Sequence, residues 1–271
     1  MNPVVAAKLA VMSARIQTLE RVLVAYSGGV DSSLVLELSH EALGEACLGV
    51  IASSPSLPRA ELQEALRLAR RRGVRVRVLD TAEVERSDYA ANGPDRCYFC
   101  KSELYARLGE VALQVGAVAI LDGFNRDDRA DWRPGRRAAT EQGVVSPLDE
   151  AGLGKEEVRD VARELGLPNW DKPAAACLSS RIPYGIPVSV ETLGRIESAE
   201  RVLRGEGFRQ LRVRDANAAA TIEVEPVDLP RLLEPRRLAR IERRLRGLGY
   251  VSVAVAASGY RRGNLNQAVG G

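Results

Sequence analysis

Histidine and lysine are scarce in this chain and its net charge is small, and the first and last of these each argue against a class of function. His40 is the single histidine among 271 residues, and no triad partner accompanies it, so we expect a structural role and no histidine acid–base chemistry. Only four of the 39 basic residues are lysine. The net charge of +3 is too small to indicate a dedicated nucleic-acid surface.

Long apolar runs are also absent. No uncharged apolar stretch approaches the roughly 20 residues that a membrane-spanning helix needs. Residues 1–20 lack the basic start, apolar stretch and cleavage site of a secretory signal, and their apolar positions fit one face of a helix. We therefore expect a cytoplasmic protein without a membrane or nucleic-acid partner.

The chain contains few cysteines, and the spacing of two of them indicates a chemical role. Four cysteines in a chain of this length do not make the disulfide framework of a small secreted protein. In a reducing compartment, the spacing Cys97-Tyr98-Phe99-Cys100 is typical of a metal site, an iron–sulfur cluster or redox chemistry. Cys47 lies within an apolar run, so we expect a buried thiol there.

Neither common glycine-rich nucleotide signature is present, because the chain has no G-x-G-x-x-G and no G-x-x-x-x-G-K-[ST]. The apolar run 22–26 is instead followed by Ser27-Gly28-Gly29-Val30-Asp31-Ser32-Ser33. Two adjacent glycines let the backbone turn sharply after a buried strand, so that N–H groups and hydroxyls can point at one anion. The helix expected over 32–43 adds the partial positive charge of its N-terminus, roughly +0.5. We expect a phosphate at this loop.

The loop resembles the pyrophosphate loop, S-G-G-x-D-S, of enzymes that split ATP between its α and β phosphates and transfer AMP. This resemblance implies that the loop binds ATP and that Asp31 contacts magnesium. The candidate ATP-binding residues of the loop are Ser27, Gly28, Gly29, Asp31 and Ser32.

Helical and strand periodicities alternate over the first half of the chain, which predicts βαβ units and a mostly parallel, doubly wound α/β sheet. The expected strands cover 22–26, 47–52, 74–79 and 117–121, and the expected helices cover 32–43, 58–72, 102–115 and 155–165. Ligands of such sheets bind at the carboxyl ends of the strands. The loops 27–33, 53–56 and 122–131 would meet there.

The pattern changes between Pro173 and Pro187, and the elements expected beyond it form a smaller α+β unit. They are helices over 189–204 and 229–246 and strands over 211–214, 219–224 and 251–255. We place the boundary close to Arg181, which gives domains over 1–180 and 181–271.

A second polar block follows the strand expected over 117–121. Its side chains should emerge at the same sheet edge as the loop 27–33, which makes Asp122, Asn125 and Asp128 further candidate ATP-binding residues. Paired carboxylates beside a triphosphate require a divalent cation, so Asp31 and Asp128 are the magnesium candidates. Lys155 begins the next helix, where a lysine opposes the helix dipole, and contact with a phosphate would explain it.

Cys177 lies in the proline-bounded loop 172–181 and forms a set with Cys97 and Cys100. Three thiolates would leave one iron of a four-iron cluster, or one position on zinc, without a protein ligand. An open position is where chemistry can happen. A redox-active pair and unrelated buried thiols are the alternatives.

The most selective motif of the chain is Ala176-Cys177-Leu178-Ser179-Ser180-Arg181-Ile182-Pro183-Tyr184-Gly185. Together with the segments 27–33, 122–135, 158–168, 212–214 and 259–264, it is similar to the LarE family of ATP-dependent sacrificial sulfur transferases. The resemblance extends over nearly the whole chain. It implies an adenine nucleotide alpha hydrolase-like fold.

That family sulfurates a pyridinium dicarboxylate mononucleotide on the route to the nickel-pincer nucleotide cofactor. The resemblance implies that ATP adenylates a substrate carboxylate with release of pyrophosphate, and that sulfur then displaces AMP to give a thiocarboxylate. The partner would be a small-molecule nucleotide.

Members with one cysteine in this region donate its sulfur and leave dehydroalanine, whereas members that also carry the C-x-x-C resemble cluster enzymes that pass on a sulfide held at the open iron. Cys97, Cys100 and Cys177 favour the cluster version, a 4Fe-4S cluster with a non-protein sulfide. Zinc and a sacrificial Cys177 stay open as alternatives, and the sulfide source is not identified.

Substrate binding is expected from the cations of the second domain. Arg212 and Arg214 alternate on one strand face, so both could hold one phosphate. The family motif adds Ser180, Arg181 and Glu200 as candidates for the substrate site. The resemblance thus implies that residues 1–180 bind ATP and adenylate, and that residues 181–271 serve substrate binding, sulfur transfer and homo-oligomerisation.

Three other functions are compatible with these motifs. Thiolation of tRNA would need a strongly basic surface, which a net charge of +3 does not supply. Ammonia-dependent amide synthesis through an adenylate would not require three cysteines. A nucleotide-binding iron–sulfur sensor without turnover would use the three thiolates to report iron or oxygen.

Overall fold

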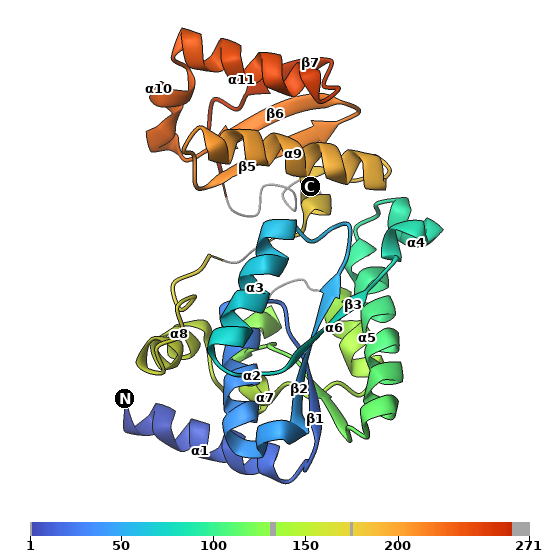
Figure 1. Ribbon diagram of the computed structural model, residues 1–271, viewed down its shortest axis with the longest axis vertical. Coiled ribbons are helices and arrows are strands. Elements are labelled where there is room, and N and C mark those ends of the chain that lie inside the picture. The colour runs from blue at the N-terminus through green and yellow to red at the C-terminus, as the bar shows by residue number, and fades with distance from the viewer. Residues whose placement is uncertain (1, 131–133, 174–175, 262–271) are drawn as a thin grey trace. The chain divides into compact units, whose positions relative to one another are not determined.

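The computed structural model describes residues 2–130, 134–173 and 176–261 (Figure 1). They form two compact units, each of which we describe by itself. The first unit consists of Met1–Glu83 with Cys97–Ala175, and the second consists of Val84–Arg96 with Ala176–Gly271.

The first unit is built on a four-stranded parallel sheet in the order β3-β2-β1-β4. Its strands are β1 (Val22–Ala25), β2 (Cys47–Ser53), β3 (Val76–Asp80) and β4 (Ala119–Leu121). Val22 pairs with Cys47 on one side and with Ala119 on the other, so the carboxyl ends of β1, β2 and β4 lie at one edge. Leu121 also forms a parallel bridge with Val145, which continues the sheet beyond β4.

Helices cover both faces of this sheet (Figure 1). On one face lie α1 (Pro3–Gln17), α2 (Val30–Leu43), α3 (Arg59–Arg71), α7 (Pro147–Glu150) and α8 (Lys155–Glu164), and on the other lie α5 (Arg96–Val115) and α6 (Pro134–Glu141). Side chains of β1 alternate between the two cores: Val22 and Val24 join the first, and Leu23 joins the second. A strand buried on both faces has to be apolar throughout, as the run 22–26 is. The predicted doubly wound α/β fold is confirmed.

The second unit has a three-stranded sheet of β5 (Leu211–Ala216), β6 (Ala219–Val224) and β7 (Ser252–Val255). The β5–β6 pair is antiparallel and the β6–β7 pair is parallel. Two longer helices, α9 (Val190–Gly205) and α11 (Pro235–Gly247), and the short α10 (Leu229–Leu232) contribute to a core of their own with these strands. The smaller α+β unit is therefore confirmed.

An upstream segment, Val84–Arg96 with the short helix α4 (Ser87–Ala90), belongs to the second unit. Asn92 is fully buried and donates from Nδ2 to the carbonyls of Pro183, at 2.8 Å, and Ile186, at 2.7 Å. The Tyr89 hydroxyl and Ser179 Oγ share a buried hydrogen bond of 2.6 Å. The motif around Cys177 is thus held by a segment about 90 residues earlier in the chain, which no local sequence signal indicates.

Two predicted helices differ from the structure. The helix expected from Ser102 begins at Arg96, so Cys97 and Cys100 lie in its first turns. The helix expected over 229–246 is divided into α10 and α11 at Pro235, because proline lacks the N–H that a continuous helix would use there. No helix in the three described ranges is long and apolar enough to cross a membrane.

Candidate functional site

The loop between β1 and α2 is shaped to receive an anion. Ser27 Oγ and Ser32 Oγ lie 2.9 Å apart in a hydrogen bond, and Ser32 Oγ also donates to the Gly29 carbonyl at 3.2 Å. Gly29 caps α2 without any side-chain hydrogen bond to the first N–H groups of that helix. Those N–H groups therefore remain available to a phosphate, which the helix dipole also attracts.

Two glycines allow the close backbone approaches at this loop. Gly28 has φ +75°, and a Cβ there would lie 2.5 Å from the Cβ of Ala65 on α3. Gly123 follows β4, and a Cβ there would lie 2.6 Å from the backbone nitrogen of Ser32. We did not single out Gly123 from the sequence. Its place directly after an aspartate at the end of a strand is the signal that could have identified it.

Acidic and amide side chains from three segments meet beside the loop. Asp31 Oδ1 accepts a 2.9 Å hydrogen bond from Asn125 Nδ2. Lys155 Nζ lies 3.0 Å from Asp128 Oδ1 in an ion pair, at the beginning of α8. The structure thus brings together four predicted residues that are up to 124 positions apart in the sequence: Asp31, Asn125, Asp128 and Lys155.

Burial raises the pKa of the Asp31 carboxyl above its usual range. The hydrogen bond from Asn125 opposes this shift, whereas the charge of Asp128 adds to it. A divalent cation would stabilise the ionised forms of both carboxylates. Asp31 and Asp128 therefore have the chemistry of a magnesium site.

Asp122 has a different environment from the one we expected for an ATP contact. Its Oδ1 accepts from Ser146 Oγ at 2.7 Å and from the Phe124 N–H at 3.1 Å, and its Oδ2 accepts from the Tyr105 hydroxyl at 3.2 Å. Arg136 Nη1 in turn donates to Ser146 Oγ at 2.6 Å. Asp122 is thus the centre of an internal network that holds the start of the loop after β4, and Tyr105, Ser146 and Arg136 are partners that we did not single out.

The four cysteines differ in accessibility. Cys47 is 1% exposed, and burial raises the pKa of its thiol to about 12, which confirms the predicted buried thiol. Cys97 is exposed, and Cys100 and Cys177 are half-buried. Cys97 and Cys100 belong to the first unit and Cys177 belongs to the second. Across the described ranges, no three His, Cys, Asp or Glu side chains are grouped closely enough to hold a metal ion.

The turn that carries Cys97 and Cys100 is attached to α6. The guanidinium of Arg137 lies 3.8 Å from the ring centroid of Tyr98, whose hydroxyl donates to Glu141 at 2.8 Å. Gly135 of α6 also lies close to this turn, because a Cβ there would lie 2.8 Å from Lys101 Cγ and 3.3 Å from the Cys97 carbonyl oxygen. Tyr98 therefore packs against α6.

In the second unit, the backbone at Cys177 is fixed by its neighbours in the motif. The Cys177 carbonyl accepts from Ser180 Oγ at 2.7 Å and from Arg181 Nη1 at 2.9 Å. Arg181 is 2% exposed and forms a two-pronged ion pair with the buried Glu200, with distances of 2.8 and 3.2 Å. Ser180, Arg181 and Glu200, which we expected at the substrate site, thus form one connected group that positions Cys177.

Arg212 and Arg214 lie two residues apart on β5 but differ in their partners. Arg214 forms a two-pronged ion pair with Glu223, at 3.1 and 2.9 Å, and also donates to the Ser180 carbonyl. Arg212 has no carboxylate partner in the described part of the chain, and its guanidinium lies 5.2 Å from the ring centroid of Tyr260. Burial and the nearby charge of Arg181 hold the pKa of Arg212 below its usual range. A cation held in this way would be stabilised by an anionic ligand.

The parallel sheet, the anion-binding loop at its carboxyl edge and the carboxylate group beside that loop define an ATP-using enzyme of the pyrophosphate-loop class, with an adenine nucleotide alpha hydrolase-like fold. Residues 7–117 match the family model of NAD synthase.

The relatives identify the family within this class. The chain is 37% identical over 262 residues to the pyridinium-3,5-bisthiocarboxylic acid mononucleotide synthase of Lactiplantibacillus plantarum, which covers 96% of this chain and 94% of the relative. The chain belongs to the LarE family of ATP-dependent sulfur transferases.

Two further relatives extend this comparison. An uncharacterized protein of Synechocystis is 43% identical over 249 residues, covering 92% of this chain and 93% of the relative. An NH3-dependent NAD+ synthetase of Hyperthermus butylicus is 30% identical over 231 residues, covering 83% of this chain and 81% of the relative. The NAD+ synthetase is less similar to this chain than the Lactiplantibacillus protein is, both in identity and in coverage. The comparison therefore favours the LarE family over the synthetase.

Proposed function

We propose that this chain converts a carboxylate of a pyridinium dicarboxylate mononucleotide to a thiocarboxylate, in a step of nickel-pincer nucleotide cofactor biosynthesis. In the first half of the reaction the substrate carboxylate attacks the α-phosphorus of ATP, the bond to pyrophosphate breaks, and an acyl adenylate forms. In the second half a sulfide attacks the acyl carbon and AMP leaves with the electron pair of the broken C–O bond. The name of the Lactiplantibacillus relative supports this substrate and product.

The residues of the first unit have the chemistry that the first half requires. The loop amides and hydroxyls at Ser27 and Ser32 would hold the leaving pyrophosphate, and Asp31 and Asp128 would hold magnesium. Lys155 would move from the Asp128 carboxylate toward a phosphate oxygen when ATP is bound. These interactions stabilise the negative charge that develops on the leaving group.

Sulfur delivery is assigned to Cys97, Cys100 and Cys177. The observation that carries this assignment is the accessibility of these three thiols, whereas the fourth, Cys47, is fully enclosed. Cys97 and Cys100 are three residues apart on a helix, so their side chains lie on one face, as ligands of one iron–sulfur cluster must. A 4Fe-4S cluster would supply a sulfide that is not part of the polypeptide, so the protein would survive the reaction.

Substrate binding is assigned to the second unit. The two-pronged pairs of Arg181 and Arg214 neutralise those two cations, which leaves Arg212 to receive the phosphate of the mononucleotide. We also propose a homo-oligomer, as the family resemblance implies.

Matched cysteine variants test the sulfur step. After anaerobic reconstitution with iron and sulfide, Cys97→Ala and Cys100→Ala should lose the brown colour of the cluster and should not make more than one product per chain. Cys47→Ala, a buried thiol outside the set, should keep both properties. Normal multiple turnover by either variant of the pair would show that the cluster assignment is wrong.

Amide formation is the second candidate, because the chain also resembles an NH3-dependent NAD+ synthetase. In that reaction ammonia would displace AMP from the same adenylate. Mass spectrometry separates the two functions: replacement of one carboxylate oxygen by sulfur supports sulfur transfer, and replacement by an NH2 group with ammonia as the only nucleophile consumed supports amide synthesis.

A further inference from the structure

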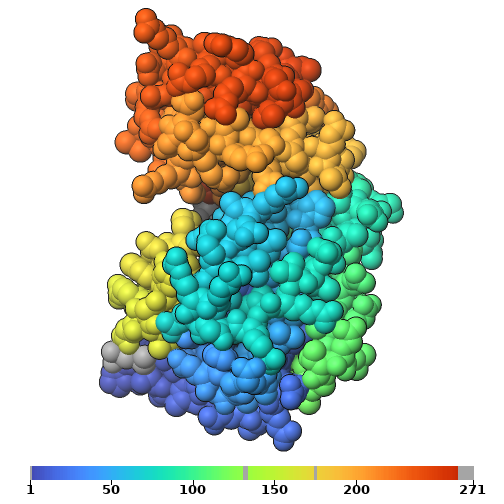
Figure 2. Space-filling model, in the orientation of Figure 1, coloured from blue at the N-terminus to red at the C-terminus, as the bar shows by residue number. Residues whose placement is uncertain are grey.

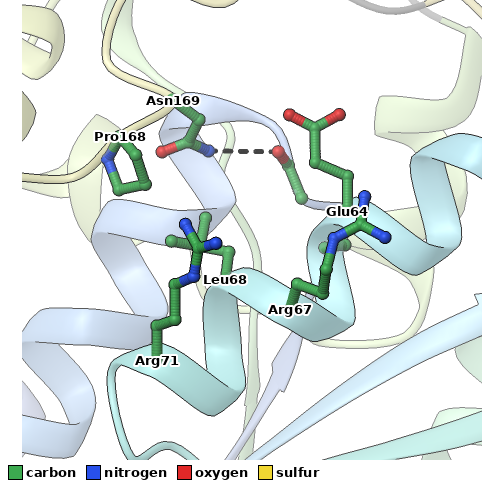
Figure 3. Close-up of a pocket in the computed structure, with 8 residues that line it drawn as sticks. Glu64, Arg67, Leu68, Arg71, Pro168 and Asn169 are labelled. Carbon is green, nitrogen blue, oxygen red and sulfur yellow. Dashed lines mark hydrogen bonds between the residues drawn. The ribbon is translucent and has the colours of Figure 1, made fainter.

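A hollow of about 100 Å³ lies in the first unit beside the phosphate-binding loop, on the side of α3 (Figure 3). Its lining consists of Gly28, Glu64, Ala65, Arg67, Leu68, Arg71, Pro168 and Asn169. α3 lies at the surface of the unit, where its residues are cyan in Figure 2. Because Arg67 and Arg71 of its lining are exposed, the hollow is open to solutes, and Gly28 of the ATP-binding loop forms part of its wall.

Arg67 and Arg71 bring positive charge to this hollow. They are four residues apart on α3, so they lie on the same face of the helix. Both are exposed, and neither forms an ion pair or hydrogen bond with any residue that the structure describes. The lining carboxylate of Glu64 is already paired with Lys172, at 3.0 Å. The cations of the lining thus exceed its unpaired anions.

Asn169 supplies a second, independent observation. It is 6% exposed, and its Nδ2 donates to the Gly28 carbonyl at 3.1 Å and to Ser33 Oγ at 2.9 Å, so it connects two points of the ATP-binding loop. Its Oδ1 is buried and has no hydrogen-bond partner in the part of the chain described here. A buried acceptor of this kind is normally satisfied by a donor on a ligand or on an ordered water molecule.

We propose that this hollow is a second anion site, which binds inorganic pyrophosphate. Two guanidinium groups on neighbouring helical positions can each take one phosphoryl group. A phosphate-type anion keeps an O–H for part of the time near neutral pH, and that O–H, or a water bound to the anion, can donate to Asn169 Oδ1. An anion bound here would be connected to the ATP-binding loop through the two hydrogen bonds that Asn169 donates to it.

The assignment of pyrophosphate as the anion rests on the proposed function, because adenylation releases pyrophosphate from ATP bound at the same loop. The binding itself does not depend on sulfur transfer. Failure of the proposed function would therefore leave the anion site intact, and failure of the anion site would leave sulfur transfer intact.

Calorimetric titration of the full chain with inorganic pyrophosphate tests the site. The chain is first saturated with magnesium and an ATP analogue whose α,β-bridging atom is a methylene group, so that the ATP site at the loop is occupied. Wild-type protein should still bind pyrophosphate. The double variant Arg67→Ala/Arg71→Ala should bind it at least about tenfold more weakly, because both charge-assisted contacts are lost.

Arg70→Ala is the matched control, because Arg70 is an exposed arginine on the same helix that does not line the hollow. Its affinity for pyrophosphate should stay within about twofold of wild type. Absence of pyrophosphate binding to the loaded wild-type protein would overturn the proposal. Equal weakening by Arg70→Ala and by the double variant would do the same, since it would reveal nonspecific attraction to a basic helix.

Orthophosphate distinguishes the two sources of a phosphate-type anion. Pyrophosphate should bind more tightly than orthophosphate under the same conditions, because it engages both guanidinium groups at once. Equal or tighter binding of orthophosphate would overturn the assignment to pyrophosphate.

Discussion

Arg212 differs from the arginines around it in having no carboxylate partner within the described ranges. Arg181 and Arg214 are each held by two hydrogen bonds to a buried glutamate, which fixes them as parts of the scaffold. The Arg212 guanidinium instead lies 5.2 Å from the ring centroid of Tyr260, and burial and the charge of Arg181 hold its pKa below the usual range. From the sequence, Arg212 and Arg214 were equivalent candidates for a phosphate, and only the contacts separate them.

Replacing Arg212 with alanine should raise the KM for the mononucleotide about tenfold to a hundredfold, because one charge-assisted contact to its phosphate is lost. The KM for ATP should not change. Steady-state kinetics with each substrate varied in turn checks this expectation. Arg209→Ala, which removes an exposed arginine from the same unit, should leave both constants unaltered, and a KM for the mononucleotide that is unchanged in Arg212→Ala would refute the assignment.

Cys47 offers a test that depends on pH. Its pKa of about 12 means that roughly one molecule in ten thousand carries the thiolate at pH 8, so iodoacetamide should modify the other three cysteines long before Cys47 in the metal-free protein. Peptide mapping after timed alkylation measures the order of reaction, and early modification of Cys47 would contradict the structure.

The buried thiol also affects how the stability of the fold depends on pH. Because the folded state raises the pKa of Cys47 above the ordinary value of 9.0, the fold should be destabilised as the pH rises from about 9 toward 12.

At the scale of elements, the active edge of the sheet depends on how closely two loops approach. The loop after β4 lies against the first turn of α2, and Gly123 is the residue that permits this contact. A Cβ at this position would collide with the backbone of Asp31 and Ser32, next to the hydrogen bond from Asn125 to Asp31.

Gly123→Ala should abolish most ATP-dependent pyrophosphate release, because the new Cβ would lie 2.6 Å from the Ser32 nitrogen and would push the two loops apart. Gly109→Ala is the control: this glycine lies in α5 with no atom within 4 Å of its Cβ position, and alanine there should stabilise the helix by up to about 1 kcal/mol. Pyrophosphate release and thermal unfolding of both variants provide the comparison. Full activity of Gly123→Ala would show that the close approach is not required.

Much of the first unit could be predicted because its elements are marked by local signals. The apolar run 22–26, the glycine pair after it and the alternation of strand and helix specify a parallel sheet with a ligand edge. Contacts between distant segments left no such signal. The segment Val84–Arg96 belongs to the second unit through Asn92 and Tyr89, whose partners lie about 90 residues later. The helix that contains Cys97 and Cys100 begins at Arg96, six residues before the start expected from the sequence.

At the scale of the whole molecule, the candidate machinery is divided between two units. The ATP-binding loop, Cys97 and Cys100 belong to the first, and Cys177 and the arginines of β5 belong to the second. The division of functions at a boundary near Arg181 stays a prediction from the sequence. The homo-oligomer stays a prediction as well. A two-step reaction needs both groups of residues, so we expect neither unit alone to make a thiocarboxylate.

Mass spectrometry of product and protein after turnover tests the central claim most directly. The reaction contains ATP, magnesium, the pyridinium dicarboxylate mononucleotide and a sulfide source, with the reconstituted full chain as catalyst. We predict more than one thiocarboxylate per chain, one AMP for each thiocarboxylate, and a polypeptide of unchanged mass. A polypeptide that has lost one hydrogen sulfide at Cys177, with no more than one product per chain, would contradict cluster-based sulfur transfer.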